Sequence, residues 1–172
     1  MVSAFSKLTW HAEQMPGHGI AIHSPVSGLV SAPDPQADPL YRSGLQPDVV
    51  QIQLQGQQLV APFAGAVSRA DMGGSRIVLH HLHGLKLELC FPHSCQQHTQ
   101  GFRWLVADRS KMHAGQPLLQ FDPARLSRWS NPLICLLSVY HHPKIQRLHS
   151  RKGFVAAGRD PLFWLELSGT GS

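Results

Sequence analysis

The chain has 172 residues, of which 42% are hydrophobic and 15% are charged, a balance typical of a packed globular domain. It contains no run of eighteen apolar residues and only three cysteines, which argues against a membrane-spanning protein and against a disulfide framework. The net charge of +5 comes from scattered basic residues without interleaved aromatic rings, so no binding of nucleic acid is expected.

Residues 1–18 precede the first strand signal and are expected to form a disordered tail. Val2, Phe5 and Leu8 have helical spacing, so a short amphipathic helix is the alternative, and through it this tail could contact a membrane, although no such contact is expected. This segment has no continuous apolar stretch of the signal-peptide kind, which makes the cytoplasm the default expectation.

From residue 20 onward, thirteen prolines and fifteen glycines interrupt the chain too often for long helices. Strands are therefore predicted, in chain order, at 20–30 (two strands around a turn), 49–54, 59–67, 76–80, 85–91, from 104, at 117–122, 133–140, 153–158 and 162–167. A short helix is predicted at 123–129 with Asp122 as its cap, and a helical turn at 144–149.

A short pattern occurs twice in this strand-rich region. Residues 24–30 and 61–67 both read small, Pro, apolar, small, Gly, any residue, Val. Proline suits the edge of a sheet, and glycine permits a sharp bend after it. The repeat therefore indicates an internally duplicated β-architecture.

The order of these segments resembles the glucose-type IIA domain of the bacterial phosphoenolpyruvate-dependent sugar phosphotransferase system. The landmarks that carry the resemblance are 24–28, 60–65, 84–87, 100–102, 114–122 and 158–162. The resemblance covers residues 19–168 and leaves 169–172 as a C-terminal tail. It implies an all-β fold, an antiparallel β-sandwich with a few short helices.

The resemblance also implies a site for phosphoryl transfer. In the family, one histidine accepts the phosphoryl group from a small carrier protein and a second histidine steadies it. Alignment of the acceptor motif with residues 89–95 puts Cys90 at the acceptor position. Counting back without gaps puts Ser75 at the partner position, and a hairpin tip at 82–83 would also place Ser75 opposite Cys90.

Other positions match the family's pocket in part. Asp38 corresponds to a pocket aspartate, whereas Ser94 stands where the family has a second carboxylate. Phe91 and Phe102 match apolar positions of the surface on which family members dock partner proteins. These four residues are the predicted binding residues.

Strand alternation places Cys90 on the same side as Lys86 and Glu88, away from the leucine core and toward the family's pocket. Cys90 is interpreted either as a neutral filler where histidine was lost or as a thiolate acceptor, which would need cationic neighbours. His93 is either a relocated acceptor or an exposed loop residue.

His81, His83 and Cys95 are the metal-ligand candidates of a region rich in histidine and cysteine. Their spacing matches no established zinc signature, so no metal and no other cofactor are expected. The His-x-His pair also resembles the second motif of lysostaphin-type zinc peptidases, but in that family the motif ends the second strand, where this chain has residues 88–90.

Together these observations favour a divergent IIA-like protein that binds other proteins, such as components of the phosphotransferase system, and carries no phosphate on histidine. The alternative is a working phosphocarrier that uses Cys90 or His93. A zinc-binding or peptidase derivative is the less favoured third hypothesis.

Overall fold

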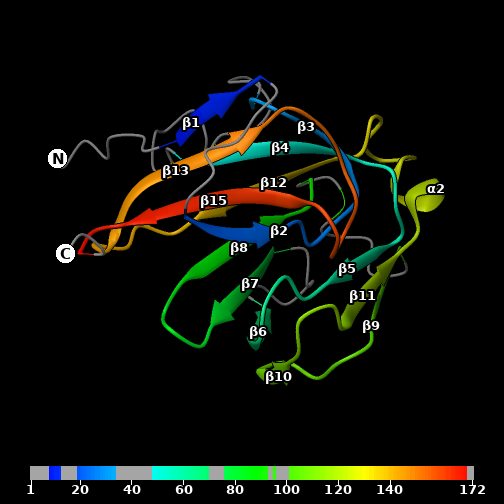
Figure 1. Cartoon of the computed structure of the whole chain (residues 1–172). Coiled ribbons are helices and arrows are strands. Elements are labelled where there is room, and N and C mark those ends of the chain that lie inside the picture. Colours follow the sequence, from blue (N-terminus) through cyan, green and yellow to red (C-terminus); the bar gives the residue numbers. More distant parts are fainter. Residues whose placement is uncertain are drawn as a thin grey trace, which may run out of the picture.

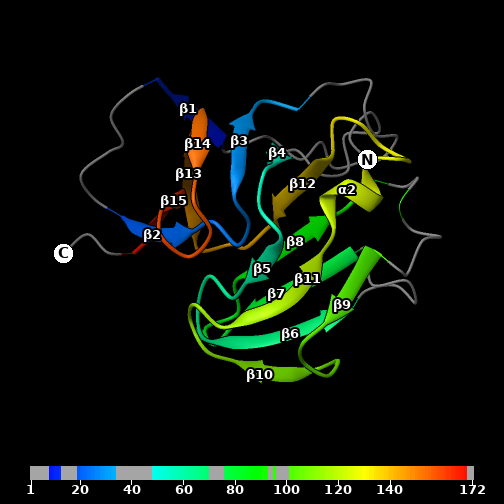
Figure 2. The same ribbon diagram turned by 90° about the vertical axis from the view of Figure 1, so that its right-hand side faces the viewer.

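Short strands separated by glycine and proline turns make up almost all of the regular structure in the computed structural model, which describes residues 8–12, 19–33, 48–69, 76–92, 95 and 101–169. These strands form three sheets (Figures 1 and 2). A four-stranded sheet has the order β1 (Leu8–His11), β13 (Ile145–Arg151), β15 (Pro161–Leu167) and β2 (Ile20–His23). A three-stranded sheet has the order β5 (Gln58–Val60), β11 (Pro117–Phe121) and β9 (Phe102–Trp104).

The largest sheet has eight strands and contains the strands that matter most for function. Its order is β10 (Ser110–Met112), β6 (Gly65–Arg69), β7 (Arg76–His81), β8 (Lys86–Cys90), β12 (Ile134–Val139), β4 (Val49–Leu54), β3 (Gly28–Ser31) and β14 (Gly153–Val155). All strand pairs among the described residues are antiparallel except β1 with β13. The predicted antiparallel all-β fold is thus confirmed.

One apolar cluster joins the three sheets. Alternate side chains of β7 and β8 enter it, and Leu79 and Leu89 are fully buried there. Phe163 of β15 and Leu118 of β11 are also fully buried, so the four- and three-stranded sheets both pack on the same core. Each such side chain contributes about 1.5–3 kcal/mol through removal from water.

The only described α-helix is α2 (Pro123–Leu126), shorter than the predicted 123–129. Its predicted cap is confirmed, because the Asp122 carboxylate accepts hydrogen bonds from the backbone N–H groups of Ala124 and Arg125. Within the described part of the chain, no helix has the length and apolar character needed to cross a membrane.

Two predictions of local structure were wrong. The helical turn expected at 144–149 is strand β13, which pairs with β1 on one side and β15 on the other. Residues Leu8–His11 lie within the expected tail, yet they form strand β1 along β13. In both cases pairing with strands distant in sequence decides the conformation, and the local pattern does not show it.

The repeated pattern has a structural explanation in its glycines. A methyl group on Gly28 would lie 2.1 Å from the carbonyl oxygen of Gln53, and one on Gly65 would lie 1.8 Å from that of His80. Neither glycine has a positive φ. Glycine is therefore required at these positions because the neighbouring backbone passes too close for any side chain.

We expect Gly65→Ala to lower the free energy of unfolding by about 3 kcal/mol. The added methyl would clash with the backbone carbonyl of His80, which cannot move away as a flexible side chain could. Urea denaturation measures the loss. Gly56→Ala is the matched control, since its added methyl would meet only the Ser27 side chain, at 3.2 Å from Cβ and 3.6 Å from Oγ. Equal losses in the two variants would contradict the steric explanation.

Candidate functional site

The predicted acceptor position lies at the end of a central strand. Cys90 is the last residue of β8 and is half-buried. Its neighbours across the sheet are Arg76 on β7 and Leu136 on β12. Cross-strand partners project from the same face of a sheet, so these three side chains share the outer face, opposite the leucine core.

The register corrects the predicted partner of Cys90. Arg76, and not Ser75, lies directly opposite it. The pairing is centred on His83 because His80 pairs with Lys86 and Gly84, with a φ of +95°, completes the turn. The tip predicted at 82–83 centres the hairpin half a residue earlier, and this difference shifts every pair by one. Ser75 itself lies outside the described residues.

A buried carboxylate stands beside the cysteine. The Glu88 side chain is 2% exposed, and its Oε1 accepts hydrogen bonds from the Arg76 Nε and, at 3.4 Å, from the Cys90 Sγ. The Tyr140 hydroxyl is a further hydrogen-bond partner of this carboxylate. Strands β7 and β8 and the residue after β12 thus build a cluster in which one carboxylate is shared by a guanidinium, a phenol and a thiol.

The electrostatics of this cluster favour the charged pair. Burial acts to raise the pKa of Glu88, but the hydrogen bonds from Arg76, Tyr140 and Cys90 and the charge of Arg76 outweigh it, so the net pKa is lowered from 4.5. The hydrogen bond to Glu88 raises the pKa of Arg76. Burial, followed by the bond to Glu88, raises the pKa of Tyr140. At neutral pH the cluster therefore holds compensated charges and a protonated phenol.

The remaining predicted site residues are distributed differently. His93, Ser94 and Asp38 lie outside the described residues. Phe91 is 2% exposed and its ring packs edge-on against Phe102 and Phe121, so Phe91 lies in the core and not on a docking surface.

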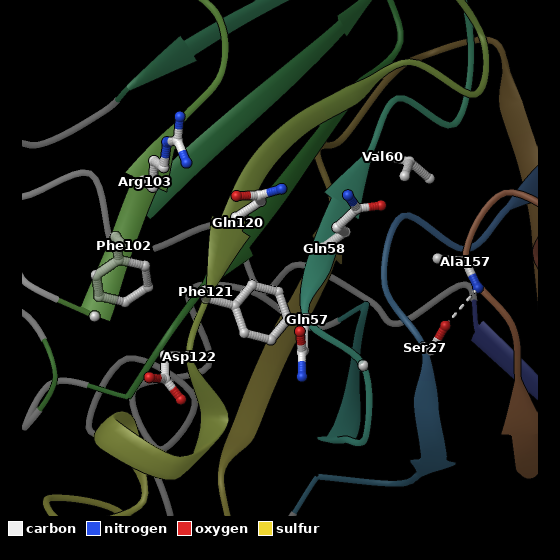
Figure 3. A pocket seen from close by; sticks show the side chains of 12 residues that line it. Ser27, Gln57, Gln58, Val60, Phe102, Arg103, Gln120, Phe121, Asp122 and Ala157 are labelled. Carbon is white, nitrogen blue, oxygen red and sulfur yellow. Dashed lines mark hydrogen bonds between the residues drawn. The ribbon is translucent and has the colours of Figure 1, made fainter.

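Phe102 lies instead at a separate open hollow of about 760 Å³ beside the three-stranded sheet (Figure 3). A row of polar side chains crosses this sheet, because Gln120 of β11 pairs with Gln58 of β5 and with Arg103 of β9. Neither Cys90 nor any other member of the Glu88 cluster lines the hollow. The structure thus does not bring Phe102 and Cys90 into one pocket.

The metal-ligand candidates do not converge. His81 and His83 have ring centroids 5.3 Å apart at the tip of the β7–β8 hairpin. Cys95 is fully buried, and its thiol lies 3.8 Å from the carbonyl oxygen of Leu126. Among the residues that the structure describes, no three His, Cys, Asp or Glu side chains are placed to hold one ion.

The alternation of residues 86–90 predicts the correct face for Glu88, but neither Glu88 nor Tyr140 was among the predicted site residues. A signal for Glu88 was present, because an acidic residue alternates with leucines in a central strand and must find a cation if it is buried. Tyr140 follows β12, and its alignment with Glu88 depends on strand pairing across fifty residues of chain. No local pattern in the sequence indicates that contact.

The chain has the β-sandwich fold of glucose-type IIA domains. Its structure is similar to that of the glucose permease IIA from Mycoplasma capricolum, with a TM-score of 0.71 over 86% of this chain and 96% of that chain. The sequence identity is only 14%, so this likeness concerns the fold alone.

Sequence comparison identifies the family within that class. Residues 20–144 match the model of the phosphoenolpyruvate-dependent sugar phosphotransferase system, EIIA 1. The glucose-specific EIIBCA component of the phosphotransferase system of Corynebacterium glutamicum is 27% identical over 119 residues, which is 69% of this chain and 18% of that protein. The chain belongs to the EIIA 1 family, and it spans less than a fifth of the curated relative that it matches.

The ion pair between Arg76 and Glu88 should contribute to the free energy of unfolding. Arg76→Met leaves the Glu88 carboxylate without its cation, which typically costs 3–5 kcal/mol when both partners are buried. Because the Arg76 side chain is 41% exposed, water replaces part of the interaction, and we expect a loss of about 1–3 kcal/mol at pH 7.

The pH dependence of that loss follows from the lowered pKa of Glu88. A carboxyl whose pKa is lowered on folding stabilises the fold above its unfolded value, here 4.5, and this contribution is lost as pH falls through the folded pKa. The difference between wild type and Arg76→Met should therefore shrink as urea denaturation is repeated below about pH 4.5. Arg125→Met, which removes an exposed ion pair with Asp122, is the control and should change little. A difference independent of pH would contradict the assigned role of Glu88.

Proposed function

We propose that this chain, over residues 19–168, is a cytoplasmic IIA-like protein that binds protein partners through the sheet face around Cys90 and carries no phosphoryl group there. The observation that carries the proposal is the buried Glu88 carboxylate, which accepts the hydrogen bond of the Cys90 thiol. A phosphoryl acceptor needs the opposite surroundings, an available nucleophile among groups that stabilise negative charge.

The magnitudes favour this view of Cys90. Two negative charges about 4 Å apart repel by roughly 4 kcal/mol at the effective dielectric constant of a protein surface. A phosphoryl group on the Cys90 sulfur would place its oxygens at about that range from Glu88. Arg76 offers little compensation, because its guanidinium already pairs with the same carboxylate. The Cys90 thiol serves in this environment as a hydrogen-bond donor to the Glu88 carboxylate.

The proposed binding surface is the outer face of β7, β8 and β12. In the family this face docks partner proteins, so losing the acceptor histidine removes the chemistry and leaves the docking surface. Leu136 is half-buried on it directly opposite Cys90. The name of the Corynebacterium relative includes IIB and IIC parts as well as IIA, which makes components of the phosphotransferase system the first partners to test.

The decisive experiment is incubation with phosphoenolpyruvate and the two general proteins of the system, followed by intact-mass spectrometry. We expect no gain of a phosphoryl mass, while a glucose-type IIA domain with both histidines is labelled in the same mixture. Labelling of wild type that disappears in Cys90→Ser would overturn the proposal and identify the thiol as acceptor. Labelling that disappears only in His93→Ala would identify a relocated histidine.

Docking is tested separately with the small carrier protein of the system, by calorimetric titration. We expect Leu136→Glu to weaken its binding at least about tenfold, because an unpaired charge would enter the interface. Leu29→Glu is the matched control: Leu29 lies on the same face of the sheet, two strands away on β3, and is 41% exposed. Equal affinities of the two variants would contradict docking at this face.

A further inference from the structure

A second site lies at the other end of the β7–β8 hairpin from Cys90. An apolar pocket of about 300 Å³ opens beside the hairpin turn, and residues of β2 and of the end of β15 line it as well. Its apolar lining includes Ile20, Leu85, Leu165 and Leu167. Ile20 is 49% exposed, so the apolar surface is accessible to a ligand. A pocket of this size is at the small end of those that hold ligands.

The polar lining of this pocket consists of basic side chains. They are His81, His83, His142 and Lys144, and no carboxylate is among the described residues that line it. The His81 Nδ1 accepts the backbone N–H of His83 at 3.0 Å, and the His142 Nδ1 accepts the backbone N–H of Lys144 at 3.1 Å. A neutral imidazole that accepts at Nδ1 carries its proton on Nε2. Two loops thus hold two imidazoles in the same tautomer, each with an Nε2–H donor.

We propose that this pocket binds a small aliphatic monocarboxylate, with the alkyl chain on the apolar lining and the carboxylate at the Nε2–H donors of His81 and His142. A carboxylate presents only acceptors and has two oxygens, which matches two N–H donors in a pocket that Lys144 also lines. An alcohol lacks the charge, and a small hydrophilic anion lacks the chain that fills the apolar part.

The site is independent of the proposed docking face. It uses the turn of the hairpin, whereas the Glu88 cluster uses its open end, and no residue is shared between them. Failure of one assignment therefore leaves the other intact.

The experiment is calorimetric titration of the full chain with octanoate, 1-octanol and acetate at pH 7. We expect saturable one-to-one binding of octanoate, at least tenfold tighter than that of either probe that lacks the chain or the charge. The double variant His81→Phe/His142→Phe should weaken octanoate binding at least tenfold and should not weaken 1-octanol binding, because Lys144 and the apolar lining remain. His113→Phe, an exposed histidine outside the pocket, is the control and should bind octanoate like wild type.

Equal binding of octanoate and 1-octanol, or non-saturable uptake by several sites, would overturn the proposal in favour of unspecific association with apolar surface. A second measurement covers the case in which the double variant does not fold. In wild type, octanoate should shift the imidazole proton resonances of His81 and His142 and leave those of His113 in place. Absence of these shifts would equally overturn the assignment.

Discussion

The alternation of the central antiparallel strands is the constraint on which the remaining features depend. Leu87 and Leu89 must enter the core, so Glu88 and Cys90 must leave it on the other side. A slip of one residue would turn Glu88 and Cys90 into the apolar core and the leucines out of it, which makes the register strongly determined. The chemistry of the acceptor position is therefore set by which residues alternate with the core, and by which residues of β7 and β12 lie opposite them.

Among the residues on the outer face of β8, Glu88 is the one whose burial most needs compensating hydrogen bonds. A charged side chain that is 2% exposed is costly unless its lone pairs are satisfied, and Arg76, Tyr140 and Cys90 all serve that purpose. Three neighbours are thus committed to one carboxylate and are less available for a ligand. The same arrangement that makes the fold tolerate Glu88 also makes the site a poor acceptor for a second negative group.

The sequence predicted the fold well where the signals were local. The segment 49–54 alternates, and it is strand β4 with those bounds; Asp122 caps α2 as its position before Pro123 indicates. Predictions failed where distant pairing decides. β13 contains Gln146, Arg147 and His149 and has no strong strand pattern, yet it has partners on both edges.

In the candidate site, too, the local features could be predicted from the sequence and the contacts between distant strands could not. Cys90 could be placed on the outer face from alternation alone, because that needs only one strand. Its neighbour across the sheet depends on the length of the hairpin loop, and the choice between Ser75 and Arg76 turned on a single residue near Gly84. Tyr140 could not be found at all, because β12 reaches β8 only through the three-dimensional order of the sheet.

The hairpin loop that shifts this register also shapes the second site. Because the pairing is centred on His83, His81 is the last residue of β7, and its ring can accept the backbone N–H two residues on. A hairpin centred half a residue earlier would give the turn a different conformation and put Ser75 opposite Cys90. One turn thus determines both which cation meets Glu88 at the open end and which imidazole nitrogen carries the proton at the tip. Changes in the length of the 82–84 turn would therefore alter both ends of the hairpin together, whereas substitutions within either cluster would alter only one.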